Sequence, residues 1–260
     1  MADEFGRRFG PRARAKVLRG EVVDAHGRVV DGATALPAGS LVYHYRDLPD
    51  EVEVPYPIPV LHRDRNIVVV DKPHFLATMP RGSHVVQTAL FRLRRDLDLP
   101  ELSPAHRLDR LTAGVLLFTV RREVRGAYQT LFTRGAVAKT YLAQSSAQPE
   151  LAAPRQVRNR IVKRRGQLQA VVEPGEPNAH SLIEPLGDGR YRLTPRTGRT
   201  HQLRVHMAGL GLPIDNDPLY PEVLDVDPGD FSRPLRLIAH RMEFDDPLTG
   251  ERRCFVSSRE

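Results

Sequence analysis

The sequence predicts an α+β protein whose central sheet is mixed but largely antiparallel and is flanked by helices and loops. Short apolar runs with strand character outnumber the segments with helical periodicity. Several of these runs follow one another directly, with only a turn such as Gly187-Asp188-Gly189 between them. A doubly wound parallel sheet would need a helix between successive strands, so the order of the elements favours α+β.

The first 59 residues differ in composition from the rest of the chain. Residues 1–15 are rich in arginine and glycine and are predicted to form a basic flexible tail, either a solubilising extension or an arm that contacts RNA. Short strands and turns are expected over residues 16–46. Residues 48–59 contain four prolines, which predict an extended linker. We therefore expect a tail at 1–15, a small segment with its linker at 16–59, and one main domain at 60–260.

The main domain contains alternating signals for strands and helices. Leu90, Leu93 and Leu97 mark one face of an amphipathic helix at 84–99, which Pro100 ends. A second helix is expected at 123–133. Two hairpins are predicted across the turns at 187–189 and 247–250. The remaining expected strands lie at 67–70, 114–120 and 138–143.

The chain is basic. It has 260 residues, of which 40% are hydrophobic, and a net charge of +7. Only four of its 39 basic residues are lysines, which indicates a genome biased toward arginine codons, although this bias does not explain the positive net charge. A basic surface attracts phosphate backbones, so the first expected partner is a nucleic acid. The densest basic run lies at 158–166 and is either a solvated hairpin or a phosphate contact.

Cysteine usage and hydropathy limit the compartment. The single cysteine, Cys254, allows no internal disulfide and no cysteine-based metal cluster. No apolar run approaches the roughly 18 residues of a membrane span, and the N-terminus lacks the apolar core of a secretory signal. We expect a cytoplasmic monomer with no membrane partner.

One carboxylate stands at a conspicuous position. Asp109 lies between Arg107 and Arg110, in a turn that leads into the apolar strand expected at 114–120. Such an aspartate is either a partner in a structural ion pair or a carboxylate held ionised for attack or proton removal. This turn by itself does not distinguish the two.

A second stretch predicts an anion site. Thr200 is expected to cap a helix whose apolar face contains Leu203 and Met207. His201 and Arg204 are three residues apart and share a different face. The result is a helix N-terminus surrounded by basic and polar groups, which suits an anion.

Together the two stretches resemble motifs of the RluA-type pseudouridine synthases. Residues 106–110 are similar to the catalytic-aspartate motif of that family, and residues 196–206 to its later arginine motif. Residues 68–73 resemble the opening strand with its lysine-proline turn, and residues 139–143 the lysine-x-tyrosine strand. The resemblance covers the chain from about residue 60 to the C-terminus. It implies an enzyme that isomerises uridine to pseudouridine in structured RNA, with no cofactor and no metal.

The resemblance also implies roles for individual residues. Asp109 would be the nucleophile or base, and Arg204 the cation that pairs with it. Tyr141 would pack on the flipped base, and Arg107 would fill the space that the base leaves. Further contacts to substrate or RNA are expected from basic side chains near these motifs and in the basic run: Lys72, Arg110, Lys139, Arg199, His201, Arg160, Lys163 and Arg164.

Some segments depart from the family pattern. Residues 16–46 resemble the second half of an αL-type RNA-binding module, whose helical first half is reduced or missing. Ala113 replaces a usual serine. Residues 216–221 replace the usual glycine-aspartate-x-x-tyrosine-glycine, and residues 74–75 replace the usual x-glycine. The departures at 113, 216–221 and 74–75 lie near the expected pocket, so we expect them to affect the choice of target, whereas residues 16–46 are expected to pack against the catalytic domain.

Competing enzyme classes fail on their motifs. A kinase catalytic loop would have no leucine between Arg107 and Asp109, and the glycine-rich loop is absent. His201 and His206 do not have the HExxH spacing of a zinc site. The acidic stretch at 215–217 lacks the glycine of a calcium loop, and no Gly-x-Ser-x-Gly is present.

The expected target is 23S ribosomal RNA, and the alternatives are a synthase that acts on transfer RNA and an inactive relative that only binds RNA.

Overall fold

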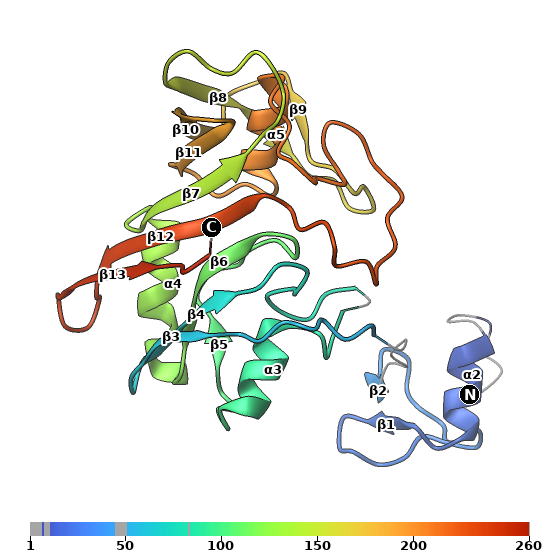
Figure 1. Ribbon diagram of the computed structural model, residues 1–260. Helices are drawn as coiled ribbons and strands as arrows, with labels where there is room; N and C mark the ends of the chain where they lie inside the picture. The colour runs from blue at the N-terminus through green and yellow to red at the C-terminus, as the bar shows by residue number, and fades with distance from the viewer. Residues whose placement is uncertain (1–6, 8–10, 45–50, 83, 260) are drawn as a thin grey trace. The chain divides into compact units, whose positions relative to one another are not determined.

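The computed structural model describes residues 7, 11–44, 51–82 and 84–259. The chain forms two compact units, Met1–Asp50 and Glu51–Glu260 (Figure 1). No helix in the described part of the chain is long and apolar enough to cross a membrane.

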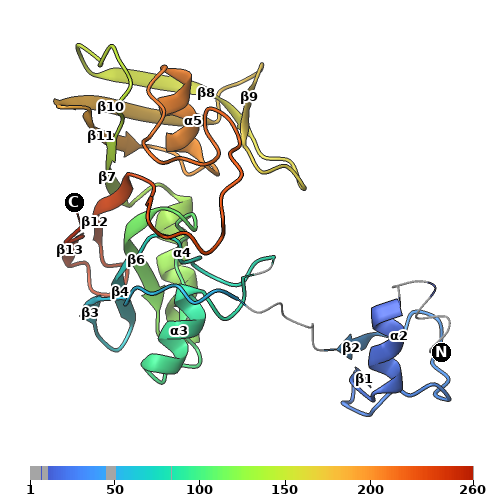
Figure 2. The same ribbon diagram turned by 45° about the vertical axis from the view of Figure 1, so that its right-hand side comes forward.

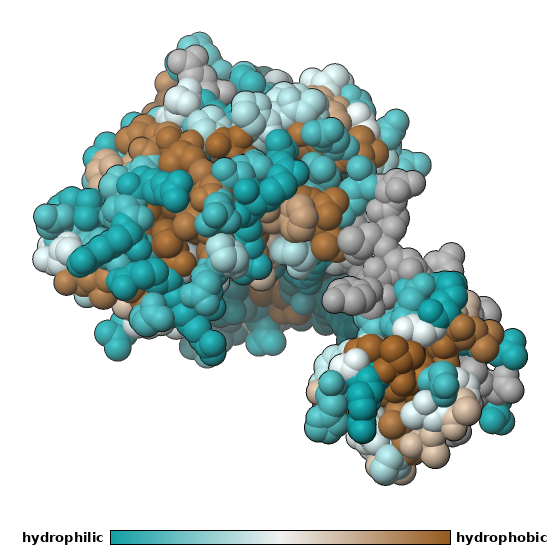
Figure 3. Space-filling view, turned by 90° about the horizontal axis from the view of Figure 1, so that it is seen from below, coloured by the Kyte–Doolittle hydropathy of each residue, from teal (hydrophilic) through white to brown (hydrophobic). Residues whose placement is uncertain are grey.

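The first unit contains one helix and a two-stranded antiparallel sheet. Helix α2 (Pro11–Leu18) precedes strands β1 (Val22–Asp24) and β2 (Val42–His44). Val17, Val22 and Val30 form a small buried core. Apolar side chains also lie on its surface, where Figure 3 shows brown atoms on this unit; the exposed ones are Leu18, Val29, Leu41 and Tyr43.

Helix α2 corrects one prediction. Residues 11–15 belong to this helix and not to a flexible tail; residues 1–6 and 8–10 lie outside the described residues. The physical reason is that Ala13 and Val17, four residues apart, are both buried, so tertiary packing stabilises a helix that is too short to form alone.

Residues 51–59 are part of the main unit, which contradicts the predicted linker. The carboxylate of Glu51 accepts hydrogen bonds from the backbone N–H groups of Val85, Val86 and Gln87. Val54 is buried, and its carbonyl accepts from Arg92. The proline-rich segment is extended as predicted, but these contacts fix it to the main unit, so the boundary lies at Asp50 and not at residue 59. Residues 48–50 are outside the described residues.

The second unit is built on one mixed sheet. Its strand order is β3-β4-β6-β12-β7-β11-β10-β8-β9, with β13 beside β12 and β5 beside β6. Every pairing is antiparallel except that of β6 with β12. The predicted α+β class is therefore confirmed. The strands are β3 (Val60–Arg63), β4 (Ile67–Lys72), β5 (Ser103–Pro104), β6 (Ala113–Thr119), β7 (Ala138–Gln144), β8 (Arg155–Val162), β9 (Val171–Glu173), β10 (Ala179–Gly187), β11 (Arg190–Pro195), β12 (Leu237–Asp245) and β13 (Arg252–Val256).

Strands β4 and β6 are buried on both faces because both contribute alternate side chains to two cores. Val68 and Val70 join the core that contains helix α3 (Ala89–Asp96). Ile67 and Val69 join the core beneath helix α4 (Arg125–Thr133). These two strands form a rigid base for the turn that precedes β6.

The predicted helices are present with shorter bounds. Helix α3 begins after Thr88, whose hydroxyl accepts from the N–H of Phe91, so the helix occupies only the middle of the predicted 84–99. The helix predicted at 123–133 is a 3-10 turn, η1 (Arg122–Val124), followed by α4. Helix α5 (Gln202–Gly209) lies against the strands β8, β10 and β11 in both ribbon views (Figures 1 and 2). The two predicted hairpins are β10–β11 and β12–β13.

Gly114 permits the one parallel contact in the sheet. It has φ = 111° and pairs with Ala239 of β12, at a distance where a Cβ atom would overlap the Ala239 main chain. Only glycine fits such an approach. Strand β6 thereby joins β3 and β4 on one side to β12 and β7 on the other. The turn before β6 lies where these two parts of the sheet meet.

Candidate active site

Hydrogen bonds from residues outside the turn hold the turn that carries Asp109 in place. Thr78 holds Leu108 on both sides, because its hydroxyl donates to the Leu108 carbonyl at 2.8 Å and accepts from the Leu108 N–H at 3.1 Å. His74 Nδ1 lies 2.8 Å from the Leu111 carbonyl. The N–H of Thr112 closes the turn on the Asp109 carbonyl at 3.1 Å. Asp109 therefore stands between anchored neighbours.

Lys72 is a further anchor and not an RNA contact. Its side chain is fully buried, and Nζ donates to the carbonyls of Pro73 at 2.9 Å, Leu76 at 2.7 Å and Arg110 at 3.3 Å. Burial lowers the pKa of Lys72 to about 7, although the nearby carboxylate of Asp109 opposes the shift. The structure thus contradicts the predicted contact, because this ammonium lies beneath the turn with no surface to offer RNA.

The basic side chains nearest to Asp109 come from helix α5 and its N-terminal cap residue. Arg204 Nη1 is 3.9 Å and His201 Nε2 is 4.0 Å from Asp109 Oδ2, and the Asp109 side chain is 22% exposed. No ion pair joins Asp109 to Arg107 or Arg110 in the described structure. Asp109 therefore forms no ion pair with the arginines beside it in the sequence. Its negative charge is balanced by Arg204, which lies about 95 residues away in the chain.

Arg204 makes its shorter contacts to a second carboxylate. Its Nε donates to Asp217 Oδ2 at 2.7 Å and its Nη2 to Asp217 Oδ1 at 2.5 Å. Burial lowers the pKa of Arg204, but the bonds and charge of Asp217 and the charge of Asp109 outweigh it and raise that pKa above its usual value. Arg204 is therefore a permanent cation between two carboxylates.

The start of α5 differs from the prediction. His201 and not Thr200 is the N-terminal cap, with φ = 59°, and its side chain makes no capping bond. Its Nδ1 instead lies 2.9 Å from the Tyr220 hydroxyl. Burial lowers the pKa of His201, against the opposing charge of Asp109. The left-handed backbone at His201 gives its ring a place beside Asp109, which a regular cap residue would not provide.

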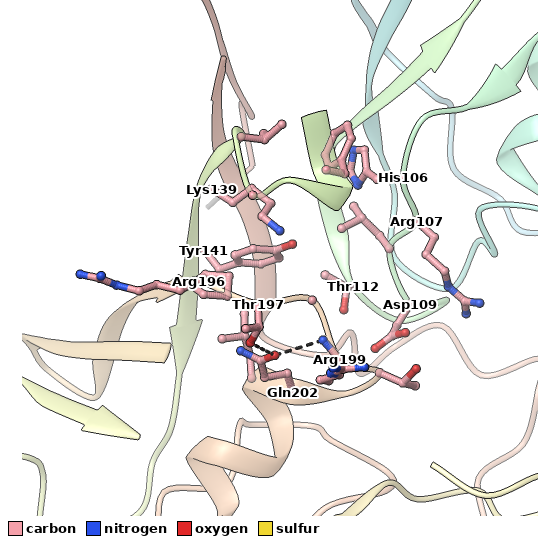
Figure 4. Close-up of a pocket in the computed structure, with 18 of the residues that line it drawn as sticks. His106, Arg107, Asp109, Thr112, Lys139, Tyr141, Arg196, Thr197, Arg199 and Gln202 are labelled. Carbon is pink, nitrogen blue, oxygen red and sulfur yellow. Dashed lines mark hydrogen bonds between the residues drawn. The ribbon is translucent and has the colours of Figure 1, made fainter. Parts of the chain in front are cut away.

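These groups open into one cavity of about 1270 Å³ (Figure 4). Its walls include the Asp109 turn, strand β7, the end of α4 and the loop before α5. Figure 4 shows the Tyr141 ring from β7 lying between Lys139 and the loop that carries Thr197. Burial and the charge of Asp109 raise the pKa of the Tyr141 hydroxyl, so it stays neutral. The cavity exceeds the 300–1,000 Å³ of ordinary small-molecule pockets.

The cavity brings together most of the predicted site. The predicted residues that line it are Arg107, Asp109, Lys139, Tyr141, Arg199, His201 and Arg204. Arg107 and Arg199 are exposed, whereas burial lowers the pKa of Lys139. Arg110 does not line the cavity, and burial lowers the pKa of its guanidinium.

The predicted basic run lies outside the cavity, on hairpin β8–β9. Arg160 and Arg164 are exposed, and Arg164 pairs with Glu173 across the hairpin at 2.5 Å. Lys163 donates to the Gln167 carbonyl, and its charge contributes to lowering the pKa of His201. The run is thus near the cavity but does not line it.

Sequence reasoning missed three groups. Asp217 and Tyr220 lie in a segment that was interpreted as a departure from a family motif and, in part, as a failed calcium loop, although that motif contains an aspartate and a tyrosine. Gln202 was not singled out. Its Oε1 accepts from the Thr197 hydroxyl at 2.7 Å and the Arg199 N–H at 3.1 Å, while its Nε2 donates to the His180 carbonyl. It fixes the basic loop before α5 to strand β10. Within the described ranges no group of three metal-binding side chains occurs.

Comparison with known proteins decides the family. The pattern of the family described as "RNA pseudouridylate synthase" matches residues 66–209, more than half of the chain. This chain belongs to the RNA pseudouridylate synthase family. As a pseudouridine synthase it is an isomerase, and the resemblance to the RluA type is confirmed by its relatives.

This chain covers most of the length of two curated relatives. The synthase is 30% identical over 232 residues to "Uncharacterized RNA pseudouridine synthase slr1592" of Synechocystis, covering 85% of this chain and 79% of that protein. It is also 30% identical to "Dual-specificity RNA pseudouridine synthase RluA" of Salmonella typhi, covering 75% and 90%. Its fold is similar to that of "Human RNA Pseudouridylate Synthase Domain Containing 1", with a TM-score of 0.63, 23% identity and coverage of 81% and 86%.

Proposed function

We propose that Asp109 is the catalytic carboxylate of this synthase and that its substrate is a uridine in 23S ribosomal RNA. The observation that carries the first part is that Asp109 provides the only carboxylate among the described residues that line the cavity. It faces two cationic or polar groups of α5 and the ring of Tyr141 across the same space.

The geometry fits the demands of the isomerisation. The reaction breaks the bond between uracil N1 and ribose C1′, rotates the base, joins C1′ to C5, removes the proton from C5 and leaves a proton on N1. One ionised carboxylate must attack or remove a proton, and Arg204 keeps a positive charge 3.9 Å away to oppose the effect of burial. Tyr141 offers a neutral ring on which the base can pack, and Arg107 is free to enter the space that the base vacates.

The size and charge of the cavity support structured RNA as the partner. A cavity of about 1270 Å³ has room for nucleotides beside the flipped uridine. Arg107, Lys139, Arg196 and Arg199 line it and carry charges suited to phosphates. Flipping a uridine from a stack costs a few kcal/mol and least in loops and bulges, so an unpaired region of a folded RNA is the expected target. We expect the synthase to act as a monomer in the cytoplasm.

Transfer RNA is the second candidate target. It is favoured by the printed name of a relative from Saccharomyces cerevisiae, "tRNA pseudouridine(32) synthase, mitochondrial", which is 29% identical over 225 residues and of which this chain covers 48%. Pseudouridine mapping of total RNA, with and without the gene, distinguishes the two. Loss of a modified position in 23S RNA supports the proposal, and loss confined to transfer RNA replaces the target.

Asp109→Asn tests the catalytic carboxylate. The change keeps the size of the side chain and removes its charge and nucleophile. Since Asp109 is partly exposed and lies 3.9 Å from Arg204 and 4.0 Å from His201, we expect a melting temperature within about 2 °C of wild type, unchanged RNA binding and no pseudouridine. A variant that forms pseudouridine at a normal rate ends the assignment. A variant that has lost stability by several kcal/mol shows instead a structural partner, and an inactive wild type would favour an RNA-binding relative.

A further inference from the structure

The guanidinium of Arg204 is committed to a carboxylate other than Asp109. Two of its nitrogens form a fork on both oxygens of Asp217, at 2.7 and 2.5 Å. The Arg204 side chain is 2% exposed and that of Asp217 is fully buried. Bidentate pairs of this kind are the strongest charge-assisted hydrogen bonds in proteins and define the plane of the guanidinium.

Asp217 is itself held in place. Its Oδ1 accepts from the N–H groups of Leu219 at 2.9 Å and Tyr220 at 3.2 Å, and its own N–H donates to the Ile214 carbonyl. The Tyr220 ring lies 5.2 Å from the Arg204 guanidinium carbon. The fork therefore has a rigid base, and Arg204 has little freedom to turn.

As a consequence, Asp109 lies near a cation but accepts no hydrogen bond from it. Only Nη1 of Arg204 faces it, at 3.9 Å, and no hydrogen bond reaches the Asp109 carboxylate from any residue that the structure describes. Its oxygens thus feel the positive charge but keep their lone pairs free. An arginine without another partner would form the fork on Asp109 itself, and that would occupy the oxygens that must react.

We propose that Asp217 is a positioning residue for the isomerisation: it holds Arg204 away from Asp109 and so keeps the reacting carboxylate ionised but unbound. This inference rests on the proposed role of Asp109. It assigns a function in the reaction to the loop between α5 and β12, in addition to its buried ion pair.

Crystal structures of the wild type and Asp217→Asn test the geometry without any activity. Asparagine keeps an acceptor for Leu219 and Tyr220 but loses the charge and one oxygen of the fork. We expect Arg204 to turn and form contacts of about 2.9 Å to both oxygens of Asp109. An Arg204 that stays 3.9 Å from Asp109 in the variant overturns the proposal, whatever the enzyme's activity.

Single-turnover kinetics on an RNA that the wild type modifies test the consequence. For Asp217→Asn we expect the rate constant of the chemical step to fall about 100-fold, while the RNA concentration for half-maximal rate changes less than about threefold. A chemical step within threefold of wild type overturns the proposal. Because the structural readout needs no product, an inactive wild type would count against the proposed function and not against this geometry.

Asp215→Asn is the matched control. Asp215 lies in the same loop and fixes it through Ser146, whose N–H and hydroxyl donate to its carboxylate at 2.8 and 2.7 Å, but it does not contact Arg204. We expect the chemical step to stay within about threefold of wild type. An equal loss in both variants would show that only anchoring of the loop matters and would overturn the proposal.

Asp217→Glu covers the case in which the asparagine variant does not fold. It keeps the charge but moves the fork by one methylene, so we expect a folded protein with a slower chemical step and unchanged RNA affinity. If neither variant folds at any assay temperature, the role of Asp217 is structural and the proposal fails.

Discussion

The end of strand β4 and helix α5 each place a buried basic side chain near Asp109, and the two side chains have different partners. Lys72, beneath the turn, is surrounded by three main-chain carbonyls and has no carboxylate within ion-pair distance in the described structure. Arg204, on α5, forms a bidentate pair with Asp217. Burial lowers the pKa of Lys72 to about 7, whereas the bonds to Asp217 raise that of Arg204.

The main-chain carbonyls around Lys72 and the carboxylate that pairs with Arg204 therefore have different effects. Carbonyl acceptors fix the shape of the turn through a group whose charge is not secured near neutral pH. A carboxylate partner secures the positive charge of Arg204, whose Nη1 lies 3.9 Å from Asp109 Oδ2, on the carboxylate that we propose to be catalytic. We therefore infer that Lys72 fixes the geometry of the turn and that Arg204 supplies the positive charge near Asp109.

Arg204→Met is expected to have the largest effect. The change leaves the carboxylate of Asp217 fully buried without its partner, which costs about 3–5 kcal/mol of unfolding free energy. Urea denaturation measures this, and the exposed Arg199→Met serves as control with an expected change below about 1 kcal/mol. Equal effects of the two changes would contradict the distinction between the buried and the exposed arginine.

Lys72→Met is expected to cost less, about 2 kcal/mol, because three carbonyl dipoles lose a donor but no full charge is left unpaired. The turn should loosen, so amide hydrogen exchange of Arg110 and Leu111 should rise while that of α5 stays unchanged. Protection that falls equally in both regions would show that Lys72 supports the whole unit and not the turn.

The pH dependence of stability should report the buried histidines of both regions. Burial lowers the pKa of His74 and His206 to about 4 and that of His106 to about 3. The folded state therefore binds fewer protons than the unfolded state below pH 6.5, and the unfolding free energy should fall as the pH drops from 6.5 toward 4.

His206→Gln tests this slope on the helix side. Glutamine can still reach Asn159, whose side-chain oxygen lies 3.0 Å from His206 Nε2, but it does not titrate. We expect the decline between pH 6.5 and 4 to become shallower in a series of denaturation curves. A slope equal to that of wild type would mean that His206 does not contribute, and the acid sensitivity would then belong to the turn.

The smallest effect on the fold should come from hairpin β8–β9. Replacing Arg160, Lys163 and Arg164 by alanine should leave the melting temperature within a few degrees and reduce the salt dependence of RNA affinity. Since Arg164 already pairs with Glu173, we expect the slope of log affinity against log salt to fall by roughly one to two units.

A control with the same loss of charge makes that result specific. It replaces three exposed arginines that lie outside the cavity and the hairpin: Arg65, Arg95 and Arg122. We expect only the general effect of net charge, a smaller change in slope. An unchanged slope in the hairpin variant would assign the basic run to a solvated surface.

The sequence by itself determined the fold class, the hairpin turns and several of the residues that line the cavity. Local signals were sufficient for these. The apolar run before Asp71 predicts a strand buried on both faces, and Gly187-Asp188-Gly189 supplies the backbone freedom that its hairpin needs. Asp109, Tyr141 and Arg204 stand in short stretches whose order along the chain is itself informative.

Only the tertiary structure decided which charges meet. Nothing local to Asp109 shows that its flanking arginines leave it unpaired, or that Arg204 binds Asp217 more closely than Asp109. Helix α2 likewise depends on burial of Val17 against Val22 and Val30, which arginine-rich composition conceals. The physical reason is common to these cases: burial and ion pairing depend on distances between segments far apart in the chain, and a sequence pattern reports only neighbours.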